Sequence, residues 1–500
     1  MTWWRDAVVY QIYPRSFRDS DGDGGGDLEG IRRELDYLVW LGIDTLWLSP
    51  IYPSPMKDFG YDVANYVDVD RLFGSLEQFD SLIRDAHAKG LRILLDWVPN
   101  HSSSEHPWFL ESRSSRTNSR RDWYVWRDAR EDGSMPNNWV RAWGEGSTWT
   151  WDGASGQYYL HCFLDSQPDL NWANVDLRLA MHDTLRFWLD RGVDGFRMDV
   201  VHLLGKDLEV DDPDDLKVLS HVPLNDVPVT HEYLRGIRAV LDEYDNERVS
   251  VGEVYLMDPN RVATYYGRGD ELHLSFNFAS LYTAWSADAW RDLIAATEAA
   301  MNPADAWPTW VMSNHDNVRV ATRLEDDDRR VRAAMTLLLT LRGTPFLYAG
   351  EELGLRDATI PPDCVVDPGG RDGCRSPLPW DLDEPHGWPA TPWLPFVEDA
   401  SRFSVQAQRG ERDSMLHFTK TLLDLRRRDD ALRRGDTEDL MASDGVLRFI
   451  RNHEGRRVMV VVNFSDVHAE VAVKGRLLLS SAGGARAGRL APGEAQVIEL

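Results

Sequence analysis

The chain has 500 residues, of which 43% are hydrophobic and 27% charged, and its formal net charge at pH 7 is -27. This length allows two to four domains, or one large barrel with additions. The negative charge excludes nucleic acid and anionic membranes as expected partners, because both need a basic protein face. It favours a small neutral or cationic partner, and the 21 Trp and 16 Tyr residues include rings of the kind that stack on sugars.

The N-terminal stretch MTWWRDAVVYQIYP has no basic segment followed by an apolar one, so we expect no secretory signal. No apolar run is long enough to cross a membrane. The three cysteines, Cys162, Cys364 and Cys374, form neither a CxxC pair nor a zinc spacing. This pattern indicates a cytoplasmic protein with free thiols. The sequence leaves open a disulfide between Cys364 and Cys374.

In chain order, short β-rich runs alternate with polar loops and amphipathic helices. Several runs are almost continuously apolar, as is typical of parallel strands buried on both faces. The eight runs are residues 7–14, 45–50, 92–98, 195–200, 248–254, 272–278, 309–316 and 344–351. Eight such runs with intervening helices predict a (β/α)8 TIM barrel. A doubly wound sheet is the alternative, but the loop after the first run lacks the required G-x-G-x-x-G motif.

Helix boundaries are marked most clearly after the second run. Ser75 is the predicted N-cap of a helix that ends before Gly90, with Gln78 completing a capping box. The segment LEGIRRELDYLVWLG, which begins at Leu28, has the same helical spacing of apolar residues.

Two stretches interrupt the alternation of strands and helices. Residues 102–171 are rich in Trp, Ser, Asn and charge, and from about residue 436 short strands replace helices. We therefore predict a barrel formed by residues 1–101 and 172–435, a small inserted domain over 102–171, and a C-terminal antiparallel β-domain over 436–500.

A glycine-rich acidic loop, RDSDGDGGGDLEG, follows the first run. Counted from Asp19, its oxygen-bearing positions follow the first part of an EF-hand ligand order, but the glutamate expected at the last position is missing and no helix precedes the loop. The candidate ligands are Asp19, Asp21, Asp23, the carbonyl of Gly25, and Asp27. A flexible acidic turn is the alternative interpretation.

In a TIM barrel the active site is built at the carboxyl ends of the strands, and polar residues end four of the predicted runs. They are Asp96 and His101, Arg197 and Asp199, Glu253, and His315 and Asp316. A single strand-end acid is usually a helix cap or an ion-pair partner. Several acids at one barrel mouth are costly to bury unless the site uses them.

Two neighbouring carboxyl groups with separated pKa values suit glycoside hydrolysis, in which one attacks and the other donates a proton. Arg197 lies two residues before Asp199 and faces the same side of the strand, so we expect it to keep Asp199 ionised as the nucleophile. The apolar neighbours of Glu253 favour a protonated general acid.

Seven motifs together resemble the α-amylase superfamily, glycoside hydrolase family 13, over residues 3 to about 425. They are YQIYPRSF, GYDVANY, DWVPNHSS, GFRMDVVH, VGEV, SNHDN and RDGCRSPLPWD. The chain is most similar to the bacterial exo-acting α-glucosidases and oligo-1,6-glucosidases. The resemblance implies a retaining mechanism with Asp199 as nucleophile, Glu253 as general acid/base and Asp316 as a transition-state contact.

The resemblance also implies the residues that hold the glucose. These are Asp62, His101, Phe163, Gln167, Arg197, His315 and Arg375, with Asp62 and Arg375 closing the non-reducing end. The glycine-rich loop is similar to a structural Ca2+ site in the same branch, and no organic cofactor is expected. Short α-glucosides such as maltose and isomaltose are the expected substrates of a monomer or homodimer.

Two rival functions follow from the same resemblance. A trehalose synthase, sucrose isomerase or other transglucosylase would keep the chemistry and change the acceptor. A transporter heavy subunit would share the fold without catalysis, but such subunits carry a transmembrane helix and usually lack the full carboxylate set. The residue after Asp199 is Val200, which this branch associates with α-1,6 linkages, whereas the following VHLLGKD resembles enzymes of α-1,4 or broader preference.

Overall fold

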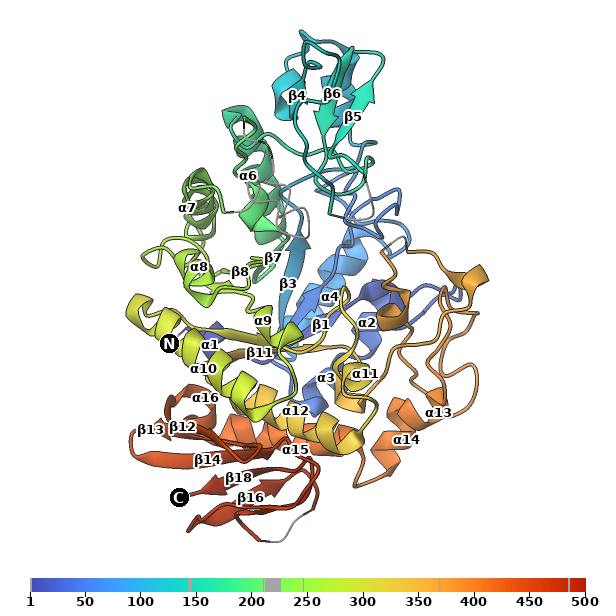
Figure 1. Ribbon diagram of the computed structural model, residues 1–500. Helices are drawn as coiled ribbons and strands as arrows, with labels where there is room; N and C mark the ends of the chain where they lie inside the picture. Colours follow the sequence, from blue (N-terminus) through green and yellow to red (C-terminus); the bar gives the residue numbers. More distant parts are fainter. Residues whose placement is uncertain are drawn as a thin grey trace.

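The computed structural model describes residues 2–142, 146–209, 211, 226–245, 247–367, 369–483 and 486–500. Its centre is an eight-stranded parallel sheet in the order β10-β11-β1-β2-β3-β7-β8-β9 (Figure 1). The strands are β1 (Val9–Ile12), β2 (Thr45–Leu48), β3 (Arg92–Trp97), β7 (Gly195–Met198), β8 (Val249–Gly252), β9 (Leu274–Ser275), β10 (Thr309–Val311) and β11 (Thr344–Tyr348). Each lies within one of the eight predicted runs.

The sheet curls into a nearly closed barrel because β1, its first strand in the chain, pairs with β11, its last strand in the chain, as well as with β2. Val9 of β1 lies opposite Thr45 of β2 on one side and Phe346 of β11 on the other. In the part of the chain that the structure describes, no ladder joins β9 to β10. The pairing of β1 with β11 confirms the barrel and excludes the doubly wound alternative.

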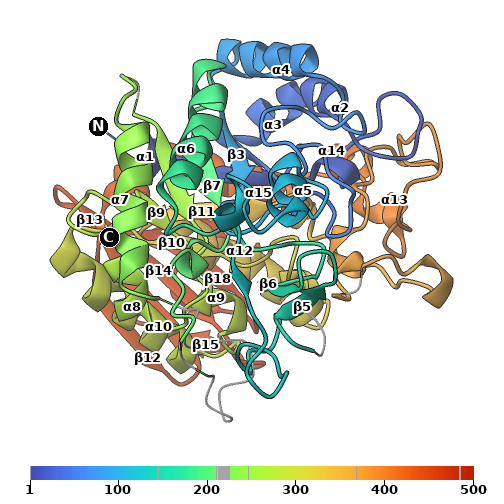
Figure 2. The same ribbon diagram turned by 90° about the horizontal axis from the view of Figure 1, so that it is seen from above.

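Helices surround the barrel, as the views from the side and from above show (Figures 1 and 2). The longer ones are α4 (Leu76–Ala88), α6 (Val175–Asp190), α7 (Val229–Leu241), α10 (Ala287–Met301), α12 (Asp328–Thr340) and α15 (Met415–Arg428). The Ser75 side chain accepts a hydrogen bond from the backbone N–H of Gln78 at the start of α4, which confirms the predicted N-cap. The helical segment from Leu28 is divided at Glu34 into α2 (Leu28–Arg33) and α3 (Leu35–Leu41).

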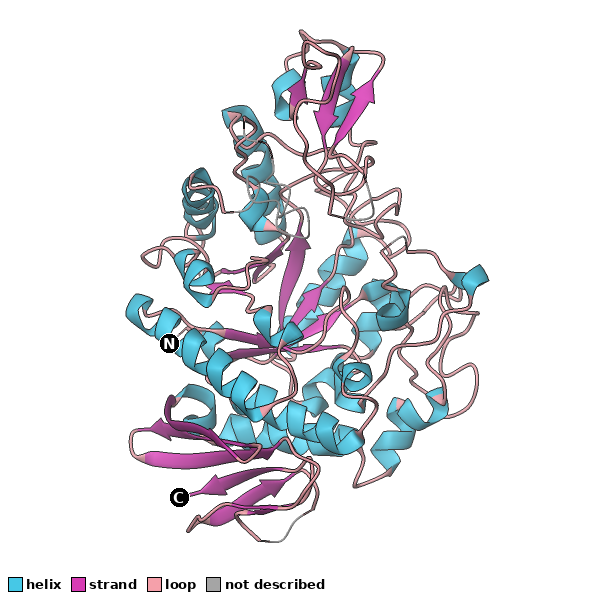
Figure 3. Cartoon of the chain, viewed as in Figure 1, coloured by secondary structure: helices cyan, strands magenta, loops and turns pink. Residues whose placement is uncertain are grey.

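A three-stranded antiparallel sheet lies between β3 and α6 in the chain and projects from one end of the molecule (Figure 3). Its strands are β4 (Trp126–Arg127), β5 (Trp149–Asp152) and β6 (Gln157–Leu160). These strands fall within residues 102–171, where we predict the inserted domain.

The C-terminal part of the chain forms a five-stranded antiparallel sheet in the order β12-β13-β14-β18-β16. Its strands are β12 (Asp436–Ser443), β13 (Val446–His453), β14 (Arg456–Asn463), β16 (Arg476–Ser480) and β18 (Ala495–Glu499). This sheet confirms the C-terminal β-domain of the predicted fold class. The precise domain boundaries stay predictions.

The three cysteines are free in the structure, with Cys162 and Cys374 buried. The disulfide left open between Cys364 and Cys374 is therefore not formed. Among the described residues, no helix combines the length and apolar character needed to cross a bilayer.

Candidate active site

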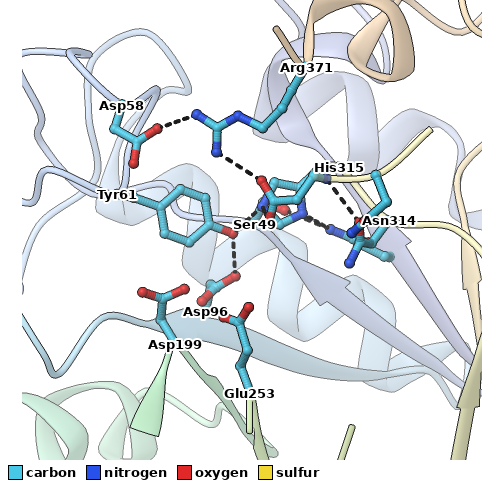
Figure 4. A network of polar contacts seen from close by, with 12 residues as sticks. Ser49, Asp58, Tyr61, Asp96, Asp199, Glu253, Asn314, His315 and Arg371 are labelled. Atoms are coloured by element: carbon cyan, nitrogen blue, oxygen red, sulfur yellow. Dashed lines mark hydrogen bonds and ion pairs between the residues drawn. The ribbon is translucent and has the colours of Figure 1, made fainter. Parts of the chain in front are cut away.

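The predicted polar residues meet at the carboxyl end of the barrel. Asp199 comes directly after β7, and Glu253 comes directly after β8. The backbone N–H of Asp199 donates to the Trp97 carbonyl of β3, and that of Glu253 donates to the Met198 carbonyl of β7. Asp96 lies on β3. Because these strands are parallel and adjacent, their ends bring the three carboxyl groups together (Figure 4).

Arg197 of β7 is the centre of this group. Its Nη1 lies 2.7 Å from both Asp96 Oδ1 and Asp199 Oδ1, and its Nη2 donates to Glu253 Oε2. The guanidinium is fully buried, so these contacts are hardly screened by water. One cation is thus shared by three carboxyl groups, and the cluster favours keeping a proton.

The pKa shifts agree with that excess of negative charge. Burial raises the pKa of Asp199 well above its usual range; Glu253 and Asp96 add to the shift and Arg197 opposes it. Burial likewise raises the pKa of Asp96 to about 6, again against Arg197. Arg197 therefore lowers the pKa of Asp199, as its position predicts, but burial outweighs this effect.

Val200 links the two strand ends through an uncommon backbone conformation. Its φ of 36° lies in the left-handed region, which is costly for a β-branched residue. In this conformation the Val200 N–H points at Glu253 Oε2, 3.3 Å away. Its side chain belongs to a buried apolar cluster that includes Cys162 and Phe163 of the insertion.

His315 follows β10 and is held by contacts on both ring nitrogens. Gln11 Nε2 lies 2.7 Å from Nδ1, and the Tyr61 hydroxyl lies 2.7 Å from Nε2. Burial lowers the pKa of His315 to about 3, so the ring is neutral at physiological pH. The Tyr61 hydroxyl also donates to Asp96 Oδ2 at 2.9 Å, and its ring stacks on His315 with centroids 5.3 Å apart.

Tyr61 therefore joins the Arg197 group to the His315 side of the site, as Figure 4 shows. We did not single it out from the sequence. The available signal was its position beside Asp62 in the GYDVANY motif.

Asp316 differs from Asp199 in contacting two arginines, of which Arg371 also pairs with Asp367 at 2.7 Å. Its Oδ1 accepts from Arg371 at 2.9 Å and from Arg375 at 3.1 Å. Burial opposes ionisation, but His315 and these two arginines together hold the pKa of Asp316 well below its usual range. Asp316 is therefore a permanent carboxylate.

An ion pair across the site joins Arg371 to Asp58 at 2.6 Å. The roles of Asp62 and Arg375 at the non-reducing end stay predictions. The Asp62 carboxylate accepts the backbone N–H groups of Lys57 and Asp58, at 3.0 and 3.1 Å, so it closes a turn of its own loop. Arg375 binds Asp316 and donates from Nε to the His315 carbonyl at 2.8 Å.

The predicted insertion residues lie beside the same ion pair. Gln167 Nε2 donates to Asp58 Oδ2 at 3.0 Å and lies 3.2 Å from His101 Nε2. The rings of Phe163 and His101 are in contact, with centroids 5.0 Å apart. The structure therefore brings His101, Phe163 and Gln167 together.

A buried lysine supports this wall of the site, and we did not predict it. Lys206 Nζ donates to Asn100 Oδ1 at 2.9 Å and lies 3.2 Å from Asp169 Oδ2. It thereby connects the loop after β7 to residues near the two ends of the insertion. Asn100 precedes His101 directly, so Lys206 acts on the position of that ring.

The glycine-rich loop gathers three of the predicted cation ligands. Carboxylate oxygens of Asp19, Asp21 and Asp27 lie within 4.8 Å of one another. Asp23 is outside that group among the described residues, and its Oδ1 accepts the Gly25 N–H at 2.7 Å.

The same carboxylates also shape the loop. Asp19 accepts the N–H groups of Gly22 and Gly24, and Asp27 caps α2 by accepting the Gly30 N–H at 2.7 Å. Each carboxylate oxygen retains capacity for a second contact. Clustered carboxylate oxygens suit a hard cation such as Ca2+.

Carboxyl groups at the ends of adjacent barrel strands, with a shared arginine, define a barrel enzyme equipped for acid/base chemistry. The family model "Alpha amylase, catalytic domain" matches residues 11–435. The chain therefore belongs to the α-amylase family of glycoside hydrolases, which confirms the predicted family.

Curated relatives and solved structures cover almost the whole chain. A probable alpha-glucosidase of Rhizobium meliloti (strain 1021) is 41% identical over 93% of this chain and 90% of its own length. An oligo-1,6-glucosidase of Parageobacillus thermoglucosidasius is 37% identical over 93% and 91%. The crystal structure of an alpha-glucosyl transfer enzyme has a TM-score of 0.94 at 39% identity and covers 100% of this chain and 99% of its own. A trehalulose synthase has a TM-score of 0.94 at 32% identity, covering 100% of both chains.

Proposed function

We propose that the protein is a retaining exo-α-glucosidase that releases terminal glucose from short α-glucosides such as maltose and isomaltose. The observation that carries this proposal is the shared guanidinium of Arg197, which holds Asp199 and Glu253 at the ends of neighbouring strands. Two carboxyl groups on one guanidinium lie close together, and retaining glycosidases need a spacing of about 5–5.5 Å.

The first chemical step divides the work between these two carboxyl groups. The Asp199 carboxylate attacks the anomeric carbon while Glu253 donates its proton to the glycosidic oxygen. The carbon–oxygen bond breaks, the aglycone leaves as an alcohol, and glucose stays bound to Asp199 as an ester. In the second step Glu253 takes a proton from water, whose oxygen attacks the same carbon and frees α-glucose and Asp199.

The proton balance of the Arg197 cluster supports this division. The mechanism needs one ionised and one protonated carboxyl group in the resting enzyme. Asp96, Asp199 and Glu253 share one cation, so the three carboxyl groups together favour retaining one proton. The permanently ionised Asp316, beside His315, is placed to accept hydrogen bonds from sugar hydroxyls.

The Asp58–Arg371 ion pair supports exo action. It joins residues 313 positions apart in the chain, from the loops after β2 and β11. In our proposal this pair, with Gln167 and His101, forms the closed end that accepts the non-reducing glucose.

Transglucosylation remains the competing function, because the solved relatives include an alpha-glucosyl transfer enzyme and a trehalulose synthase. Incubation with maltose, isomaltose, sucrose and trehalose, followed by chromatography of the products, separates the two. Hydrolysis predicts glucose as the dominant product from the preferred substrate. A new disaccharide as the dominant product would overturn it.

We further propose that the loop of Asp19, Asp21 and Asp27 holds a structural Ca2+, with Asp23 and the Gly25 carbonyl as candidate ligands. The close approach of three carboxylates supports a cation there. The loop precedes α2 and lies outside the Arg197 cluster, so the ion would stabilise the fold without entering the chemistry. Three free thiols support a cytoplasmic location.

A further inference from the structure

A second charged hollow lies at the opposite, amino end of the barrel strands. Its volume is about 230 Å3, and its lining includes residues beside the starts of β1, β2 and β3 and from α15. The charged side chains are four arginines and two aspartates: Arg92, Arg426, Arg427, Arg433, Asp6 and Asp44. A cationic hollow is unexpected in a chain of net charge -27, so it needs a local explanation.

Both aspartates are already neutralised. Asp6 accepts from Nε and Nη2 of Arg434, which is not part of the lining. Asp44 accepts the Val8 N–H at 2.9 Å and pairs with Arg427 at 3.0 Å. The positive charges of Arg92 and Arg426 therefore have no carboxylate in the lining left to balance them.

Arg426 is buried without a carboxylate partner among the described residues. It donates to the carbonyls of Leu339, Leu432 and Gly343, and its Nε has no hydrogen-bond partner. Burial lowers its pKa to about 10, so the guanidinium stays charged at neutral pH.

A second buried arginine adds to this positive charge. Arg451 of β13 donates to the same Leu432 carbonyl and to Thr340 O and Gly435 O. These carbonyls lie at the C-terminal ends of α12 and α16 (Asp430–Arg434), and each helix end supplies about half a negative charge. These helix ends offset part of the charge of the two buried arginines.

The rim of the hollow supplies further donors. The Arg92 guanidinium lies 4.5 Å from the centre of the Trp3 ring and has no ion pair among the residues that the structure describes. Arg433 pairs with Asp430 through Nη2, while its Nε has no partner. At about 30 Å3 per water molecule, the hollow has room for a tetrahedral oxyanion and its hydration.

We propose that this hollow binds a dianionic oxyanion, either free inorganic phosphate or the phosphate group of a small monoester, held by Arg92 and Arg433 above the buried charge of Arg426. Planar guanidinium groups match such oxygens in charge and geometry. The ligand would tie the amino end of the barrel to α15 and α16, next to the C-terminal domain (Figure 1). This binding does not depend on the proposed catalytic function.

Titration calorimetry at fixed ionic strength tests the proposal, with inorganic phosphate and glycerol 3-phosphate as separate probes. We expect saturable binding of at least one probe and a matching rise in melting temperature. The double variant R92Q/R433Q should bind about tenfold more weakly or worse, because it removes two charge-assisted donors. Binding of the monoester alone would identify its phosphate group as the ligand.

The control variant R268Q/R412Q removes the same charge at two exposed arginines elsewhere and should bind like the unmodified protein. Circular dichroism checks that both variants fold, and the single variant R92Q replaces the double if it does not. Absence of saturable binding of both probes would overturn the proposal. So would unchanged binding by a folded R92Q/R433Q, or displacement of phosphate by glucose, which would place the ion among Arg371 and Arg375.

Discussion

The two sides of the candidate active site use the same residue types in different proportions. Around Arg197, three carboxyl groups share one guanidinium, and burial raises the pKa values of Asp199 and Asp96. Around Asp316, Arg371 and Arg375 are shared by three carboxylates, Asp316, Asp58 and Asp367, and the pKa of Asp316 falls well below its usual range. Burial acts in the same direction on both sides, so the ratio of acids to cations decides which side keeps a proton.

The largest expected effect comes from substituting the two catalytic carboxyl groups that contact Arg197. E253Q removes the proton donor and D199N removes the nucleophile, so each should lower kcat/KM on maltose about 10⁴-fold or more. An activated aryl glucoside, whose leaving group needs no proton, should restore the first step in E253Q but not in D199N. Steady-state kinetics on both substrates measure the difference. Equal rescue of the two variants would contradict the assigned roles.

The second comparison separates two acids of one loop. D58N breaks the ion pair to Arg371 and should lower kcat/KM by about 10²-fold, mainly through weaker glucose binding. D62N is the matched control, because Asp62 bonds only within its own turn in the contacts described above. It should lower the melting temperature more than it lowers activity. The reverse ranking would support Asp62 as the glucose contact.

The raised pKa of Asp96 predicts a pH dependence of stability. Its folded pKa is about 6 against an ordinary value of 3.8. Between these values the folded state binds more protons than the unfolded state, so the contribution of Asp96 to stability falls as pH rises through this window. The expected loss is on the order of 3 kcal/mol.

D96N should lack that decline, whatever its absolute stability. Urea unfolding of both proteins at several pH values from 4 to 7 measures the slope. Parallel slopes for the two proteins would show that Asp96 does not hold the extra proton.

The smallest expected effect concerns the glycine-rich loop, which lies outside both sides of the comparison. Chelation should lower the melting temperature by a few degrees, because a bound cation stabilises only the folded state. The value of kcat on maltose below that temperature should not change. D21N, which alters an exposed member of the cluster, should abolish the response to chelator. An unchanged melting curve would leave the loop as an acidic turn without a cation.

The sequence predicted those features that depend on local pattern. Each strand is a short apolar run, and the residues that end β7 and β8 follow directly from where those runs end. Asp199 and Glu253 could therefore be placed without coordinates. The division of the first helical segment at Glu34 was not visible, because its apolar spacing continues through the break.

Contacts between loops could not be predicted in the same way. Asp58 and Asp62 lie in one loop, and only its three-dimensional turn decides which carboxylate points towards Arg371. The same holds for Lys206, whose partners Asn100 and Asp169 are distant in the chain. The sequence shows Arg197 beside Asp199, but the burial that raises the pKa of Asp199 becomes visible only in the structure.

The central claim is that Asp199 attacks glucose while Glu253 manages the proton, and covalent trapping tests it most directly. In E253Q, α-glucosyl fluoride needs no proton donor to react, and hydrolysis of the resulting ester lacks its base. Mass spectrometry of peptides after a rapid acid quench should find one added glucosyl group on the peptide that contains Asp199, and none in E253Q/D199N. A glucosyl group on another residue, or rapid turnover with inversion at the anomeric carbon, would contradict the account.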